Sequence, residues 1–310
     1  MKRIFLFALA LALLPSSLFA AALGTAARSV IPSDIQQIIA VDYRRMAGST
    51  TAQALHDRVL PENLKQFEGA LKGVGIVPDR DIDQLAFASF RADNKVRFVG
   101  VAQGQFSVKK IVARLRQRKV KPTRVQSGLV YSMGSGMDMT LLDDNTMLFG
   151  PPEAVKSALQ ARDGVIDSLN SNSKITDIMP GVDSAPVWSV LDSVGTQNMM
   201  RSALGEAARL ADYEMVKKRL VASRYIMDFS NGVNFDLDVF TSDQMTASML
   251  SSLLQAGVRF KKMNASGVEK IALDSTSVDS DGQQLKLHFK TDEKRFESLL
   301  SSDLFAAVSK

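Results

Sequence analysis

The chain offers few side chains for acid-base, nucleophilic or metal chemistry. It contains two histidines, His56 and His288, and no cysteine. His56 lies in a polar helical stretch, and His288 alternates with Leu287 and Phe289 in a predicted strand. We therefore expect both imidazoles to be solvated or hydrogen-bonded. No Gly-x-Ser-x-Gly sequence marks a nucleophilic serine. A hydrolase would need a site assembled from distant segments, and we predict no catalytic residue.

One acidic run has part of the pattern of a calcium-binding loop. Asp79, Asp81 and Asp83 have the alternate spacing of its ligands, but Gln84 replaces the glycine and Phe90 the closing glutamate. We predict the surface entry to a strand instead, and no metal site.

Two glycine-containing stretches do not have the sequence pattern of a cofactor-binding loop or a nucleophile turn. Residues 73–78 lack the third glycine of a dinucleotide-binding loop and follow a predicted helix instead of a strand. Residues 134–136, Gly-Ser-Gly, lie between two short predicted strands and predict a turn. We expect no bound cofactor.

A basic segment is the strongest interaction signal. Residues 105–137 contain no Asp or Glu, although the formal net charge of the chain is only +5, so the molecule is electrically polarised. Val108, Ile111 and Leu115 fall on one helical stripe behind Ser107, a predicted N-cap, which leaves the cations toward solvent. Eight residues form this candidate site: Lys109, Lys110, Arg114, Arg116, Arg118, Lys119, Lys121 and Arg124.

Two interpretations of this basic segment stay open. It is either a solvated helix face or a contact surface for an anionic partner, such as phospholipid headgroups, lipopolysaccharide phosphates or an acidic protein. Nucleic acid is the least favoured partner, because no aromatic residues alternate with the basic ones.

The second half of the chain is rich in methionine, including Met200, Met215, Met245, Met249 and Met263. Methionine fills irregular cores, which is the simpler interpretation, and it also lines adaptable apolar clefts. A carrier of an apolar ligand is therefore one alternative function.

The N-terminus has the pattern of a secretory signal peptide. Lys2 and Arg3 precede an apolar run over residues 4–14, and Ala20 and Ala22 fit an A-x-A cleavage site. We expect cleavage after Ala22, with Ala20 as the second choice, and a periplasmic or secreted protein. The alternative is a retained N-terminal membrane anchor.

The remaining chain reads as two halves with the same order of predicted elements: strand, helix, two strands, helix, strands, helix. We predict a signal peptide at 1–22, a first α+β unit at 23–165, a linker or long loop at 166–184 and a second α+β unit at 185–310. The expected fold class is α+β, each half an antiparallel sheet with helices packed on one face.

Several elements of the second half are predicted individually. Asn231-Gly232 and Asp281-Gly282 mark hairpin turns. A helix is expected from Thr196 to about Leu220, and a strand from Lys270 to Val278.

In layout, the chain resembles exported bacterial proteins of unknown function that combine a signal peptide with a duplicated α+β body. The similarity is carried by the phrases Ala86–Phe90 (AFASF) and Val187–Asp192 (VWSVLD). It implies a Gram-negative envelope location and no site residues. The expected function is an exported, non-enzymatic binding or interaction protein, with a hydrolase or an apolar-ligand carrier as alternatives. The sequence does not predict the oligomeric state.

Overall fold

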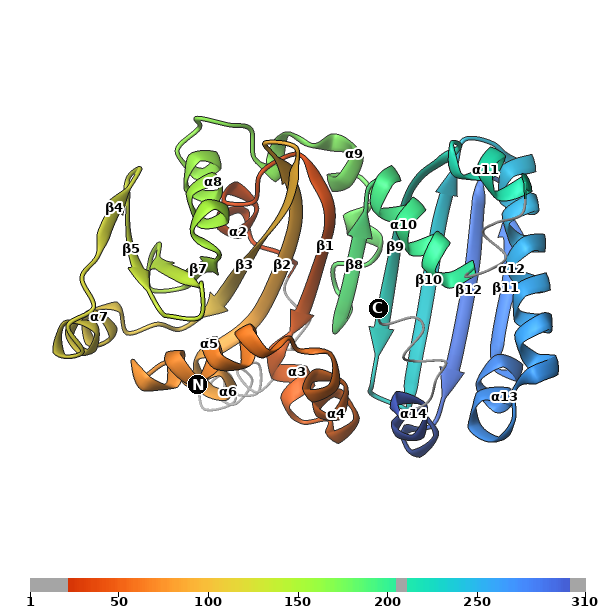
Figure 1. Cartoon of the computed structure of the whole chain (residues 1–310), viewed down its shortest axis with the longest axis horizontal. Coiled ribbons are helices and arrows are strands. Elements are labelled where there is room, and N and C mark those ends of the chain that lie inside the picture. Colours follow the sequence, from red (N-terminus) through yellow and green to blue (C-terminus); the bar gives the residue numbers. More distant parts are fainter. Residues whose placement is uncertain (1–21, 205–210, 302–310) are drawn as a thin grey trace, which may run out of the picture.

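The computed structural model describes residues 22–204 and 211–301, and their strands form one antiparallel sheet (Figure 1). Within these residues the strand order is β11-β12-β10-β9-β8-β1-β2-β3-β7-β6-β5-β4. The strands are β1 (Ile35–Asp42), β2 (Ile82–Ala92), β3 (Lys95–Gly104), β4 (Thr123–Val125), β5 (Gly128–Ser132), β6 (Asp138–Leu141), β7 (Thr146–Gly150), β8 (Val187–Leu191), β9 (Leu220–Asp228), β10 (Val233–Thr241), β11 (Thr276–Asp281) and β12 (Gln284–Thr291).

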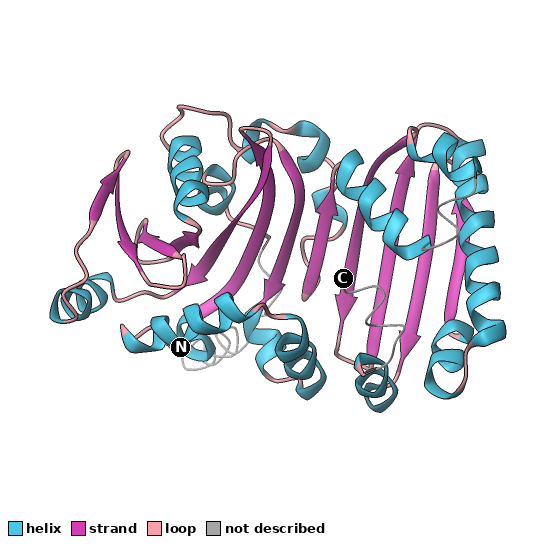
Figure 2. Ribbon diagram, in the orientation of Figure 1, coloured by secondary structure: helices cyan, strands magenta, loops and turns pink. Residues whose placement is uncertain are grey.

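Helices pack around this sheet, and the α+β class predicted from the sequence is confirmed (Figure 2). The helices are α2 (Thr25–Ser29), α3 (Tyr43–Ala47), α4 (Thr50–Val59), α5 (Glu62–Gly73), α6 (Pro78–Asp81), α7 (Val108–Gln117), α8 (Pro152–Arg162), α9 (Ser173–Thr176), α10 (Ser193–Leu204), α11 (Ala211–Lys217), α12 (Gln244–Asn264), α13 (Gly267–Asp274) and α14 (Glu293–Leu300), with 3-10 turns η2 (Leu169–Ser171) and η3 (Met179–Gly181).

The sheets of the two halves are continuous through β1 and β8. Ile38 lies opposite Ala88 of β2 on one side and Val190 of β8 on the other. Ile38 and Val190 are both 0% exposed. The backbone N–H and C=O groups of a strand buried on both faces need hydrogen-bond partners at both of its edges. The pairing of β1 with β8 supplies these partners at the edge of β1 that does not face β2 and at the edge of β8 that does not face β9.

Helices cover the sheet differently in its two halves. In the first half α8 packs on the face that carries Ala88 and Val99, whereas α5 packs on the opposite face against Phe149. In the second half α12 covers one face, through Leu250 and Leu254. The other face of β9, β10 and β12 carries charged side chains, including the Arg224–Asp238 ion pair at 2.9 Å.

The segment 166–184, predicted as a linker or long loop, connects the two halves and is itself packed. Leu169, Ile175 and Met179 are almost fully buried, in the same core as Ile38. Its Ser, Asn and Asp residues favour short turns, and η2, α9 and η3 supply the backbone hydrogen bonds that let this segment be buried.

Two element predictions in the second half need correction. The strand expected over Lys270–Val278 is wrong, because the structure places α13 over Gly267–Asp274 and starts β11 only at Thr276. The stretch around Lys270 is rich in good helix formers, and α13 buries Ala272 and Leu273 on one side. The single helix expected from Thr196 is α10 followed by α11, and residues 205–210 lie outside the described part.

The predicted signal peptide also lies outside the described residues, except for Ala22. Among the helices that the structure describes, none is both long enough and apolar enough to span a bilayer.

Candidate anionic contact site

Helix α7 and the short edge strand β4 present the predicted basic segment. Ile111 is 3% exposed and Leu115 is fully buried, and both belong to the core under α5 and β7. Val108 and Val112 are half-buried on the same side. The apolar stripe therefore points inward, as the sequence predicts, and the cationic residues project away from the sheet.

All eight basic residues are exposed, and we call this set the basic face. Within the described part of the chain, none of the eight has an acidic side chain within ion-pair distance. Its members are Lys109, Lys110, Arg114, Arg116, Arg118, Lys119, Lys121 and Arg124. Their positive charges are therefore available to an external partner.

Two arginines of the basic face lie against a glycine-containing turn. A methyl group added at Gly75 would meet Nη1 of Arg114 at 1.3 Å, and one at Gly73 would meet the Arg118 guanidinium at 2.7 Å. The stretch 73–78 thus follows helix α5, as predicted, and its glycines make room for two guanidinium groups. Gly75 also has φ +86°, a conformation that glycine adopts without strain.

Of the two acidic residues beside this face, Asp81 already has partners. Asp81, Asp144 and Arg114 all line an open depression of about 620 Å³. Asp81 accepts hydrogen bonds from Arg80 at 2.7 Å and from the Val77 backbone N–H at 2.7 Å. The hydrogen bond to Arg80 is the main cause that lowers the pKa of Asp81, so its carboxylate is charged but compensated by a residue outside the basic face.

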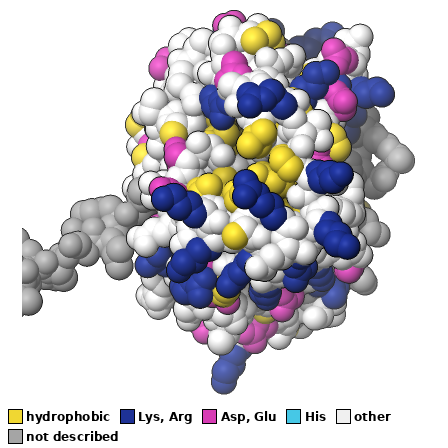
Figure 3. All heavy atoms as spheres, turned by 90° about the vertical axis from the view of Figure 1, so that its left-hand side faces the viewer, with side chains coloured by type: hydrophobic (Ala, Val, Ile, Leu, Met, Phe, Trp, Pro, Cys, Tyr) yellow, Lys and Arg dark blue, Asp and Glu magenta, His cyan; other side chains and the backbone are white. Residues whose placement is uncertain are grey.

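The surface around the basic face also carries apolar area. Leu129 on β5 is 45% exposed, and it lies directly opposite Arg124 in the β4–β5 ladder, so their side chains share one face. Figure 3 views this end of the molecule, with Lys and Arg side chains distributed around an exposed apolar area. This end of the molecule therefore combines exposed cations with exposed apolar side chains.

The two histidines have ordinary hydrogen-bonded positions. His56 contacts Asp57 at 3.1 Å and Glu68 at 3.3 Å, and the hydrogen bond to Glu68 raises its pKa. His288 on β12 contacts Asp236 at 2.6 Å on the exposed face of the sheet. Among the described residues, neither imidazole has a Ser or Thr hydroxyl as a hydrogen-bond partner, so neither histidine is aligned with a hydroxyl nucleophile.

The three aspartates with calcium-loop spacing do not converge. Asp79 accepts a hydrogen bond from Tyr43 at 3.3 Å, Asp81 is paired with Arg80, and Asp83 forms an ion pair with Arg44. The described residues contain no cluster of His, Asp or Glu that could hold a metal ion. The spacing instead serves three separate surface contacts around the start of β2.

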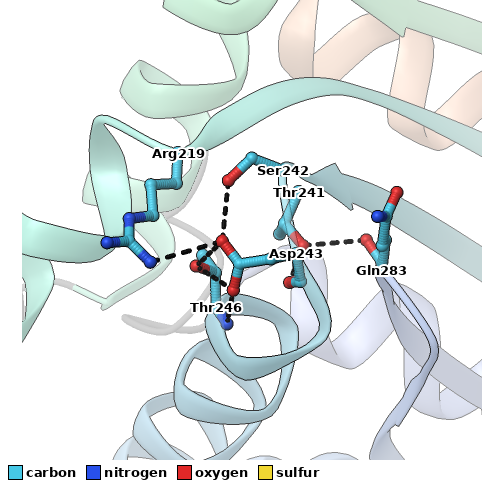
Figure 4. A network of polar contacts seen from close by, with 6 residues as sticks. All are labelled: Arg219, Thr241, Ser242, Asp243, Thr246 and Gln283. Atoms are coloured by element: carbon cyan, nitrogen blue, oxygen red, sulfur yellow. Dashed lines mark hydrogen bonds and ion pairs between the residues drawn. The ribbon is translucent and has the colours of Figure 1, made fainter.

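Figure 4 shows a polar network at the start of α12 that was not predicted from the sequence. Asp243 accepts hydrogen bonds from the Thr246 backbone N–H at 2.8 Å and from Ser242 Oγ at 2.8 Å, and it pairs with Arg219 at 3.3 Å. The Thr246 hydrogen bond is the main cause that lowers the pKa of Asp243 to about 2. The Ser-Asp-x-x-Thr sequence is the signal for this N-cap.

The methionines of the second half do not share one environment. Met200 is fully buried in the core beneath α12, whereas Met215, Met245 and Met263 are between 57% and 75% exposed. An apolar cavity, described below, lies in the first half.

Comparisons with known proteins give a likeness of fold only. No family model matches the chain, and no curated protein matches it. Crystal form I of a protein named TP0453 superposes with a TM-score of 0.50 at 11% identity, covering 88% of this chain and 96% of that one. Crystal form III of TP0453 gives a TM-score of 0.49 at 11% identity and covers 89% of this chain and 98% of that one. Crystal form IV gives a TM-score of 0.46 at 9% identity and covers 91% of this chain and 97% of that one. The chain thus has an overall fold similar to that of TP0453 in crystal form I.

Proposed function

We propose that this chain is an exported, non-enzymatic interaction protein of the bacterial envelope that contacts an anionic lipid surface through its basic face. The observation that carries the contact is the set of eight exposed cations without acidic partners among the described residues. The basic and apolar pattern at the N-terminus supports export.

The dimensions of the basic face favour an extended anionic surface over a single small anion. Helix α7 has ten residues, which at 1.5 Å per residue gives a length of about 15 Å. Further cations continue past its end to Arg124 on β4. Charges spread over this length can contact several phosphates at once, and each Lys or Arg near an anionic bilayer contributes about 1 kcal/mol.

Exposed Leu129 favours lipid over an acidic protein as the partner. An apolar side chain among cations gains free energy when it enters the boundary between headgroups and acyl chains. Binding to an acidic protein is the competing outcome, and it would leave adsorption to lipid vesicles undetectable.

Adsorption to vesicles tests this proposal. We expect the protein to bind vesicles that contain phosphatidylglycerol, to bind pure phosphatidylcholine vesicles much more weakly, and to lose affinity as NaCl is raised, because salt screens exposed charges. Replacing four cations by Gln should reduce binding by at least about tenfold. The variant carries Arg114→Gln, Arg116→Gln, Arg118→Gln and Lys119→Gln.

A matched variant removes four exposed charges elsewhere and should bind like the parent. It carries Lys156→Gln, Lys174→Gln, Lys270→Gln and Lys294→Gln. Equal losses in the two variants, or no adsorption of the parent, would contradict the contact site. Export is tested separately by the N-terminus of the protein isolated from cells, which should begin at Leu23 or Ala21.

A further inference from the structure

An apolar cavity of about 90 Å³ lies between the sheet and the helices α3–α6. Strands β1, β2 and β7 form its floor, and α5 forms most of its roof. Its lining is almost entirely apolar, with Leu64, Phe67 and Leu71 from α5, Leu85 and Phe87 from β2, and Phe149 from β7. None of the eight residues of the basic face lines it.

The exposure pattern of β2 shows that this face of the sheet is incompletely covered. Ala86 and Ala88 point to the opposite face and are each 1% exposed. Leu85 and Phe87 alternate with them and are only half-buried, although β2 is paired on both edges, with β1 and β3. Solvent therefore reaches two large apolar side chains in the middle of the sheet through the roof of helices.

Stacked aromatic rings and proline-bounded helices hold the cavity walls. The Phe67 ring stacks on Phe149 with centroids 4.9 Å apart, and Phe87 meets Phe149 edge-on at 5.9 Å. Pro61 precedes α5 and Pro78 begins α6, which fixes the backbone where these short helices start. Rigid rings and fixed helix starts resist collapse of the roof onto Leu85.

Polar side chains at the rim are already paired with one another. The hydroxyl of Tyr43 donates to Asp79 at 3.3 Å, which links α3 to α6. His56 contacts Glu68 at 3.3 Å, which links α4 to α5. Burial is the main cause that raises the pKa of Tyr43, as expected for a phenol at the edge of an apolar space. A ligand in the cavity would therefore gain from apolar contact and would need no hydrogen-bonding group.

We propose that this cavity is a binding site for a small neutral hydrocarbon group, no larger than a single ring or a short alkyl end. An apolar cavity of about 150 Å³ in another protein stays dry and binds benzene or xenon. The cavity here is smaller, and the partly buried side chains of Leu85 and Phe87 show that it is not sealed from solvent. Its size excludes a whole lipid, since pockets for drug-sized ligands enclose about 300–1,000 Å³.

Titration with benzene and xenon, followed by NMR of the methionine methyl groups, tests the site in the full chain. Met147 lines the cavity, whereas Met200 is buried in the separate core beneath α12. We expect a saturable shift of the Met147 methyl signal and no shift of the Met200 signal. Met147→Leu assigns the signal with little change of volume. Absence of a saturable Met147 shift with both probes would overturn the site.

Variants on α5 locate the bound molecule. Leu64→Trp fills the cavity and should weaken benzene binding at least tenfold, whereas Leu253→Trp on α12 should leave it unchanged. Leu64→Ala enlarges the cavity and should bind naphthalene more tightly than the parent does. Unchanged affinities in both Leu64 variants would also overturn the site. The four-Gln variant of the basic face should bind benzene like the parent, so failure of either proposal is visible separately.

Discussion

At the scale of single residues, Asp243 illustrates how a carboxylate in the described structure acts on stability. Its oxygens accept hydrogen bonds from Ser242 and from two groups of Thr246, and it pairs with Arg219. These partners stabilise the charged form, which is why its pKa falls to about 2 from an ordinary value of 3.8. A carboxyl whose pKa is lower in the folded state stabilises the fold above its unfolded pKa.

We predict that Asp243→Ala lowers the urea midpoint of unfolding at pH 7, because the variant loses the cap of α12. The difference between the parent and the variant should shrink as the pH falls from about 4 to about 2, since over that window the carboxyl of Asp243 takes up a proton in the unfolded chain before it does so in the folded one. Urea titrations at several pH values measure it. Asp279→Ala, an exposed aspartate on β11, serves as the control, and a difference from the parent that is constant with pH would contradict the assignment.

At the scale of elements, helix α7 ends with a lysine in a left-handed backbone conformation that usually holds glycine. The Val120 N–H donates to Leu115 at 3.0 Å and the Lys119 N–H donates to Arg116 at 2.9 Å, the hydrogen bonds of a Schellman motif. Lys119 has φ +60°, the left-handed conformation that glycine adopts most readily. A lysine therefore stands where glycine would be more stable, and it adds a charge to the basic face.

Replacing Lys119 distinguishes the effect of its backbone conformation on stability from the effect of its charge on vesicle binding. We predict that Lys119→Gly raises the free energy of unfolding by up to about 1 kcal/mol, because it relieves the left-handed strain. The same variant should bind phosphatidylglycerol vesicles more weakly than the parent. Lys121→Gly removes a charge at an exposed position without a left-handed backbone, so it should weaken vesicle binding without raising stability. Chemical denaturation of both variants measures the contrast, and equal stabilities would argue against it.

At the scale of the whole molecule, the two halves share one sheet and are held by further contacts at the junction of β1 and β8. Arg91 on β2 pairs with Asp34 at 2.9 Å and with Asp192, which follows β8, at 2.8 Å. Trp188 on β8 is fully buried in the core that also contains residues of the first half. The packing therefore couples the halves, although the order of elements suggests a duplication.

We predict a single cooperative unfolding transition for the described body. Fluorescence of Trp188, the only tryptophan, and far-ultraviolet circular dichroism should give the same midpoint in urea. Ile38→Ala in β1 should lower both midpoints together, by about 2–5 kcal/mol of stability, because Ile38 is fully buried. Val96→Ala, at a site that is 58% exposed, should change little. Separate transitions for the two signals would show that the halves unfold independently.

Local features of this protein could be predicted from its sequence. The stripe of Ile111 and Leu115, the hairpin at Asn231-Gly232 and the α+β class follow from side-chain periodicity and turn chemistry within short windows. The strand predicted over Lys270–Val278 fails for the same reason, because a short apolar run fits helix and strand alike.

Only the tertiary structure decided the rest. The pairing of β1 with β8, the guanidinium of Arg114 over Gly75 and the cavity beneath α5 each join residues distant in sequence. The pattern within a strand shows that it needs neighbours, but the choice among neighbours depends on how all buried surfaces pack at once. The exposure of the four cations on α7 could thus be predicted from its helical pattern, whereas the missing acidic partners of the basic face could be recognised only after the described chain had folded.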